Sequence, residues 1–208
     1  MNERLVERTL RVFSDELASA AAVPGGGSAA AYAGAMGAAL TAMVGRIAAR
    51  KEQTEATAAL VAEADNLRSD FLRLVDDDSA AFARVSEAMK LPKSTDDDKK
   101  ARKERLQSAL LAASRVPLEV AKTSRRLLDL CERTMSTAPN ATVSDIGVGA
   151  LMAESALQGA ALNVMINLAS LTDSAQVKAL SEDLDRAVDG ADTQRKRITD
   201  FVEARIAR

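Results

Sequence analysis

A run of small residues from Val23 to Arg50, VPGGGSAAAYAGAMGAALTAMVGRIAAR, constrains the fold of this chain more than any other stretch. It opens with a proline and three glycines and then becomes helix-like, with nearly every residue Ala, Gly, Ser or Thr. Small residues recur at every fourth position in two neighbouring rows, which are Ala30, Gly34, Ala38 and Ala42, and Ala33, Gly37, Thr41 and Gly45. Such rows let another backbone pack very close. We therefore expect a central helix with other helices or a second subunit against it.

The three glycines at its start suit a sharp turn or a close approach to another group. Ser28 follows as a natural N-cap, so we expect the helix to begin there. The first turn of a helix presents unpaired N–H groups and the positive end of the dipole, which can seat a carboxylate or phosphate. The alternative is a glycine-rich connection that binds nothing.

The composition favours helices and excludes several kinds of catalysis. Hydrophobic residues make up 47% of the 208 but aromatic residues only 2%, so the core must be built from Ala, Leu, Val and Met. There is no histidine, which rules out Ser-His-Asp and Cys-His catalysis and the usual zinc site. Any general base must be a carboxylate, a lysine or Tyr32. The lone Cys131 fits a reducing compartment and is expected to be inert.

The uncharged run from Leu17 to Gly45 is long enough to span a membrane. Pro24 and the glycines interrupt it, and Ala and Gly give weak insertion energy, so we expect a buried core helix and no membrane partner. The first residues are charged, unlike a secretory signal, which predicts a cytoplasmic location. A net charge of -2 does not indicate a nucleic-acid surface.

Periodicity predicts an all-α fold: an up-and-down bundle of about six helices in one domain over residues 1–208. Apolar residues at helical spacing continue through segments 2–20, 28–50, 52–89, 95–115, 118–131, 145–171 and 173–208. Pro92 ends one helix, Ser94 or Thr95 caps the next, and Pro117 is expected to interrupt or kink it. Thr142 or Ser144 is expected to cap the helix that begins near residue 145.

Polar groups on apolar helical faces are the other candidates for function. Among three consecutive aspartates, Asp78 lies four residues from both Leu74 and Phe82, whereas Asp77 should face solvent. A carboxylate at the edge of an apolar core has its pKa raised by desolvation, as a general base near neutral pH requires. The alternative is that all three are solvated. Asn163 and Asn167, one turn apart, need partners, either helix termini across the bundle or a ligand.

Six spaced motifs together resemble the cyclodeaminase/cyclohydrolase family. They are VPGGGSAAAYAGAMGAAL, LVDDDSAAF, LPK with an acid-rich cap, RVPLEVA, VSDIGVGA and NVMINL. The resemblance covers about residues 5–175. It implies an all-helical bundle that associates as a homodimer, with folate bound in a cleft near the subunit contact.

The resemblance also implies hydrolysis of 5,10-methenyltetrahydrofolate to 10-formyltetrahydrofolate. By it, Asp78 is the candidate base, with Asp76 the second choice. Lys51 and Lys93 match places where the family tends to be basic, and either could protonate the leaving N5 or hold the substrate's glutamate carboxylates. The residues that the resemblance implies in substrate binding are Pro24, Gly25, Gly26, Gly27, Ser28, Asp76, Asp145, Asn163 and Asn167.

Two alternative functions stay open at this stage. One is a cyclodeaminase that releases ammonia from 5-formiminotetrahydrofolate, and the other is a non-catalytic folate-binding helical dimer. The sequence has no formiminotransferase portion, which favours a stand-alone cyclohydrolase. We expect no cofactor beyond the tetrahydrofolate substrate and no metal, because neither a ligand cluster nor a dinucleotide fingerprint occurs.

Overall fold

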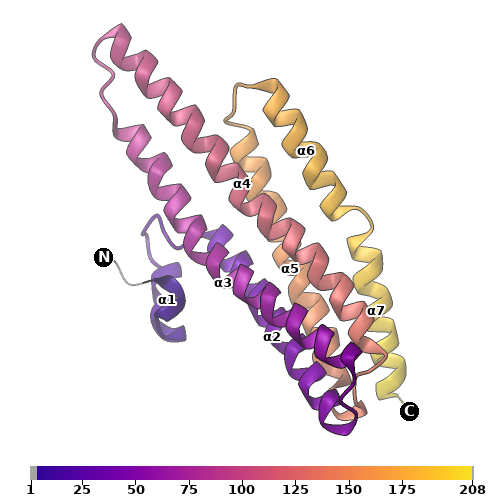
Figure 1. Ribbon diagram of the computed structural model, residues 1–208. Helices are drawn as coiled ribbons and strands as arrows, with labels where there is room; N and C mark the ends of the chain where they lie inside the picture. The colour runs from indigo at the N-terminus through magenta and orange to yellow at the C-terminus, as the bar shows by residue number, and fades with distance from the viewer. Residues whose placement is uncertain (1–3, 208) are drawn as a thin grey trace.

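The computed structural model describes residues 4–207, and every regular element among them is helical. The elements are η1 (Leu5–Glu7), α1 (Leu10–Leu17), α2 (Gly26–Lys51), α3 (Glu55–Lys90), α4 (Asp96–Met135), η2 (Asn140–Thr142), α5 (Val143–Leu168), α6 (Ser174–Val188) and α7 (Ala191–Ile206). The chain runs alternately down and up the bundle through α2, α3, α4 and α5, and α6 and α7 descend on its outer side (Figure 1). The all-α prediction is confirmed.

The long helices differ in length, and this difference shapes the molecule. Helix α2 has 26 residues, whereas α3 has 36 and α4 has 40. Gly27, at the start of α2, lies against Asp78 of α3. Twelve further residues of α3 follow Asp78, so at 1.5 Å per residue α3 extends about 18 Å beyond the start of α2. The upper parts of α3, α4 and α5 therefore continue beyond the N-terminus of α2 (Figure 1).

The small-residue rows of α2 bring neighbouring helices into very close contact, as predicted. A Cβ added to Gly34 would lie 2.4 Å from the Phe71 ring of α3. One added to Gly37 would lie 2.9 Å from the carbonyl oxygen of Gly149 in α5. Only glycine permits these approaches, so α2 packs tightly between α3 and α5.

The predicted interruption at Pro117 is wrong, because α4 continues through it from Asp96 to Met135. A proline removes one helical hydrogen bond, and packing against α2 and α5 holds the helix together across the gap. The cap predicted before this helix is confirmed at Thr95, whose side chain accepts from the Asp98 N–H.

Three other boundaries differ from the prediction. Helix α2 begins at Gly26 with Gly25 as its N-cap, so Ser28 is not the cap but a buried residue of the first turn. The segment expected as one helix over residues 2–20 contains η1 and the short α1, and its residues 2 and 3 lie outside the described residues. Thr142 is the N-cap residue of α5 but makes no side-chain cap bond.

Helix α2 is the one described helix that is long and apolar enough to cross a membrane. In this fold, 61% of its most apolar 18-residue window is buried. Because the core helix of a soluble protein has the same length and composition, the property is weak evidence for a membrane span.

Candidate functional site

A cleft of about 310 Å³ lies above the N-terminus of α2. Residues of α3, α4 and α5 line it, together with the segment that leads into α2. Helix α2 begins at the cleft, so the first-turn N–H groups that lack a helical acceptor and the positive end of its dipole lie at the cleft floor. The volume is at the lower end of the roughly 300–1,000 Å³ typical of small-molecule sites.

Asp78 lies at the cleft floor and covers the start of α2. A Cβ added to Gly27 would lie 2.1 Å from Asp78 Oδ1, so the carboxylate rests directly on the glycine backbone. The hydroxyl of Ser28 lies 2.9 Å from Asp78 Oδ2 and 3.0 Å from the carbonyl oxygen of Val75, and it can donate to one of them at a time. Ser79 Oγ is 3.2 Å from the same hydroxyl. These contacts hold the Asp78 carboxylate at the N-terminus of α2.

Burial raises the pKa of Asp78 above its ordinary value, and this effect outweighs the hydrogen bonds from the Ser28 side chain and backbone, which lower it. The direction and the leading cause agree with the prediction from its place on the apolar stripe of α3. Asp77, by contrast, forms an ion pair with Arg73 at 2.6 Å on the surface of the same helix. A partly desolvated carboxylate in a cleft can accept a proton near neutral pH.

Two side-chain amides face the same cleft from α5. Asn163 donates from Nδ2 to the carbonyl oxygen of Gly159, one turn back in its own helix, at 2.8 Å. Asn167 donates from Nδ2 to the carbonyl oxygen of Ala113 in α4 at 3.1 Å. Both amides therefore have partners, but these are carbonyls inside α5 and α4 and not the predicted helix termini. Both residues line the cleft.

The walls of the cleft are apolar. They are formed mainly by Phe82, Val85, Met89, Leu110 and Ile166. Phe82 is 44% exposed and Ile166 is 68% exposed, although both are large hydrophobic residues. Apolar walls with a few polar groups at the floor are typical of small-molecule sites.

The sequence missed these wall residues, because an isolated phenylalanine or isoleucine on a helix normally indicates a core position. Phe82 lies one turn after Asp78, and Ile166 lies next to Asn167. Their closeness in the sequence to the candidate polar residues Asp78 and Asn167 was the only signal that they line the cleft.

Asp76 and Pro24 lie near the cleft but do not line it. Asp76 accepts hydrogen bonds from the Leu5 N–H and from Arg4 Nε, both at 2.8 Å, so it holds the N-terminal segment on α3. Pro24 is buried and follows a cis peptide bond. The structure therefore gives Asp76 protein partners in place of the predicted contact with substrate.

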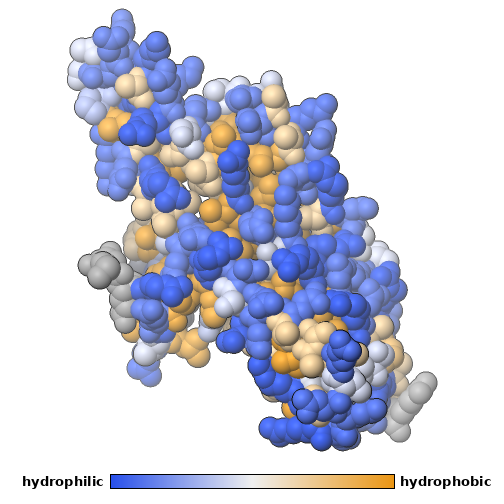
Figure 2. Space-filling model, viewed as in Figure 1, coloured by the Kyte–Doolittle hydropathy of each residue, from blue (hydrophilic) through white to orange (hydrophobic). Residues whose placement is uncertain are grey.

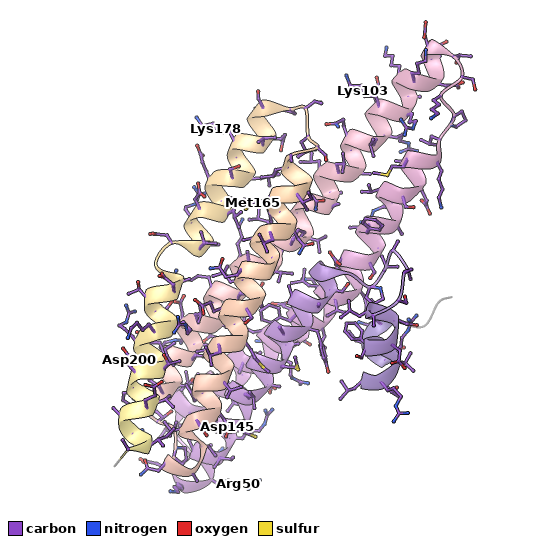
Figure 3. All side chains as sticks on the ribbon, turned by 180° about the vertical axis from the view of Figure 1, so that it is seen from behind. Arg50, Lys103, Asp145, Met165, Lys178 and Asp200 are labelled. Carbon is purple, nitrogen blue, oxygen red and sulfur yellow. The ribbon has the colours of Figure 1, made fainter. Side chains whose placement is uncertain are left out.

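The structure does not bring Lys51, Asp145 and Lys93 to the cleft. Lys51 ends α2, about 36 Å from Gly27 at 1.5 Å per residue. Asp145 lies in the first turn of α5, about 27 Å from Asn163 by the same measure. Figure 3 shows Asp145 and Arg50 at the same end of the bundle, away from Met165.

Lys93 is exposed in the connection between α3 and α4. That tip of the molecule is mostly hydrophilic in Figure 2. Within one copy of the chain, Lys51 and Asp145 therefore cannot contact a group held beside Asp78, and Lys93 does not line the cleft.

Two other hollows on the described surface have arginine side chains as well as a carboxylate in their walls. One of about 350 Å³ between α3 and α4 includes the exposed Arg84 and Arg105. Another of about 520 Å³ includes Arg46, which forms an ion pair with Asp65. Over residues 4–207, no three His, Cys, Asp or Glu side chains are grouped so as to hold a metal ion. The cleft at Asp78 is therefore the candidate site.

Comparison with known proteins gives concordant results. A family model described as formiminotransferase-cyclodeaminase matches residues 9–186. The chain is 37% identical over 202 residues to a methenyltetrahydrofolate cyclohydrolase of Methylorubrum extorquens, with 95% of this chain and 97% of that protein covered. It is 36% identical to a formimidoyltransferase-cyclodeaminase of Sus scrofa and spans 39% of that protein's length.

A solved structure has the same fold. The crystal structure of formiminotetrahydrofolate cyclodeaminase from Thermotoga maritima matches with a TM-score of 0.85 and 27% sequence identity. The match covers 96% of this chain and 98% of that one.

Proposed function

We propose that this chain, which belongs to the formiminotransferase-cyclodeaminase family, hydrolyses 5,10-methenyltetrahydrofolate to 10-formyltetrahydrofolate. The observation that carries the proposal is the partly desolvated Asp78 carboxylate at the floor of an apolar cleft. The similarity to a methenyltetrahydrofolate cyclohydrolase over nearly the whole length of both proteins supports the same reaction.

The chemistry needs few groups. The substrate is a cation whose charge is shared between N5, N10 and the carbon that bridges them. Water adds to that carbon while Asp78 takes one of its protons, which leaves a neutral adduct. The bond from carbon to N5 then breaks, N5 gains a proton, the adduct hydroxyl loses its proton and becomes the formyl oxygen on N10, and one proton is released overall. A carboxylate beside the carbon both stabilises the cation and accepts the proton.

A cyclodeaminase is the second candidate, because the Thermotoga maritima structure of the same fold has that title. Its substrate has the same ring system, and Asp78 would then move protons to the departing ammonia. An assay that follows absorbance of the methenyl chromophore, beside one that measures ammonia released from 5-formiminotetrahydrofolate, separates the two. Chromophore loss above background without ammonia supports the cyclohydrolase, ammonia release supports the cyclodeaminase, and silence in both refutes catalysis.

We also propose that the protein works as a cytoplasmic homodimer with no cofactor beyond its folate substrate. The support for a dimer is the apolar exposed surface of α2 and α5. Its large members, each at least 37% exposed, are Met36, Met43, Val148, Leu151, Leu162, Met165 and Ile166. Helix α5 has only two charged residues, Asp145 and Glu154, and Glu154 is paired with Arg195 of α7. A surface of this kind is typical of contacts between subunits.

Sedimentation of the protein at micromolar concentration tests this dimer. Leu151→Glu, in the middle of the α5 surface, should shift the protein towards monomer. Leu10→Glu on α1 makes the same substitution at a more exposed leucine (71% against 46% for Leu151) outside that surface and is the control. A wild-type protein that sediments as a monomer would rule out the dimer.

A further inference from the structure

Pro117 and Asn167 are linked through one carbonyl group. In an α-helix the N–H of residue 117 would donate to the carbonyl oxygen of Ala113, but proline has no N–H. That carbonyl oxygen is the one that accepts from Asn167 Nδ2, at 3.1 Å, across the contact between α4 and α5. Pro117 thus leaves the Ala113 carbonyl oxygen without a helical donor, and Asn167, a cleft residue, donates to it instead.

This bond fixes which way the Asn167 amide faces. A carbonyl oxygen can only accept, so the end of the amide that meets Ala113 must be the NH₂ group. The Asn167 oxygen then lies at the other end, and no described residue donates to it. Asn167 lines the cleft, so its Oδ1 is an acceptor available to a ligand there.

We propose that Pro117 is a positioning residue for substrate recognition: it frees the Ala113 carbonyl to hold the Asn167 amide so that Oδ1 accepts an N–H of the pterin ring. The nature of the ligand rests on the proposed function. Pro117 does not touch the ligand and acts only through Asn167.

The bond from Asn167 to the Ala113 carbonyl differs from other side-chain bonds to backbone carbonyls in α4 and α5. Ser114 and Ser124 donate to carbonyls one turn back in α4 itself, at Leu110 and Val120, and Asn163 does the same within α5. Those acceptors also have their ordinary helical N–H partners. The Asn167 bond instead crosses to another helix, at the position where the sequence of α4 provides a free acceptor.

Pro117→Ala tests the proposal. The substitution restores the N–H of residue 117, which competes for the Ala113 carbonyl and loosens Asn167. Alanine is a far better helix former, so the melting temperature should stay the same or rise. Loss of one neutral hydrogen bond should raise the KM for methenyltetrahydrofolate about three- to tenfold, with kcat within about twofold of wild type. Pro139→Ala, at the far end of the bundle, is the control and should leave KM unchanged.

A double-mutant comparison distinguishes positioning from a general effect. Asn167→Ala should raise KM by a similar factor, and Pro117→Ala should add nothing in that background. An unchanged KM for Pro117→Ala, or effects that multiply in the double variant, would overturn the proposal.

NMR of the Asn167 side-chain amide gives a readout that does not depend on turnover. Its signals should shift in Pro117→Ala and stay in place in Pro139→Ala. If the wild-type protein neither consumes the methenyl compound nor releases ammonia, the proposed function fails, and the amide signals alone then decide the link between Pro117 and Asn167. Unshifted signals in Pro117→Ala would refute that link.

Discussion

Gly27→Ala should disable the enzyme while leaving it folded. The new Cβ would lie 2.1 Å from Asp78 Oδ1, 2.5 Å from Cγ and 2.8 Å from Oδ2. An ordinary carbon–oxygen contact is about 3.3 Å, so the carboxylate must move by about 1.2 Å. A shift of that size would break its 2.9 Å contact with Ser28 and take it out of line with the bound substrate.

The expected effects follow from that displacement. A misplacement of about 1 Å can cost about 100-fold in rate, so kcat should fall by about that factor. Loss of the hydrogen bond to a charged group costs about 1.5–3 kcal/mol, and replacement of a helical glycine returns about 0.5–1 kcal/mol. The free energy of unfolding should therefore fall by about 1–2 kcal/mol.

Two other glycines make the comparison sharp. At Gly26 the nearest atom to a new Cβ is Asn163 Nδ2 at 3.4 Å, an ordinary contact, so Gly26→Ala should have a much smaller effect. At Gly147, on the far end of α5, the nearest atom is 3.4 Å away in Val202, and Gly147→Ala should keep full activity. The measurements are kcat by loss of the methenyl chromophore and unfolding in urea. A Gly27→Ala variant with wild-type kcat would refute the catalytic role of the positioned Asp78.

Three further predictions concern ionisable groups. Asp78→Asn should abolish turnover. Because burial raises the pKa of Asp78 in the folded protein, the wild type loses stability as pH rises from about 4 through that raised pKa. The variant should therefore gain stability over the wild type with rising pH, and urea unfolding at pH 4 and pH 8 that shows the opposite trend would contradict this. Ser28→Ala removes a hydrogen bond that lowers the pKa of Asp78, so the acidic limb of the kcat profile should move to higher pH; an unmoved limb would count against Asp78 as the base. Burial raises the pKa of Cys131 to about 11, so its thiol should react with a disulfide reagent at pH 8 only after denaturation, and rapid labelling of the folded protein would be inconsistent with the structure.

The sequence was sufficient for the helical class and for much of the cleft floor. Periodicity and capping depend on residues within a few turns of each other. They therefore predicted the central helix and the Thr95 cap. The apolar stripe of α3 predicted the raised pKa of Asp78, because desolvation follows from the face on which a residue lies.

The tertiary structure decided which distant residues share the site. Asp78 and Asn163 lie 50 and 135 residues beyond Ser28 in the sequence, and the register of α2 against α3 and α5 brings them to its N-terminus. The same register takes Lys51 and Asp145 to the other end, because a helix rises about 1.5 Å per residue however its motifs are spaced in the sequence.

Pro117 shows the same division within one residue. Its sequence context predicted a break or a kink in the helix, since a proline removes an N–H and clashes with the preceding turn. Only the packed structure shows that the helix continues and that the freed carbonyl is used by Asn167. Local chemistry determined which backbone group lost its partner, and the packing of α5 against α4 decided which side chain replaced it.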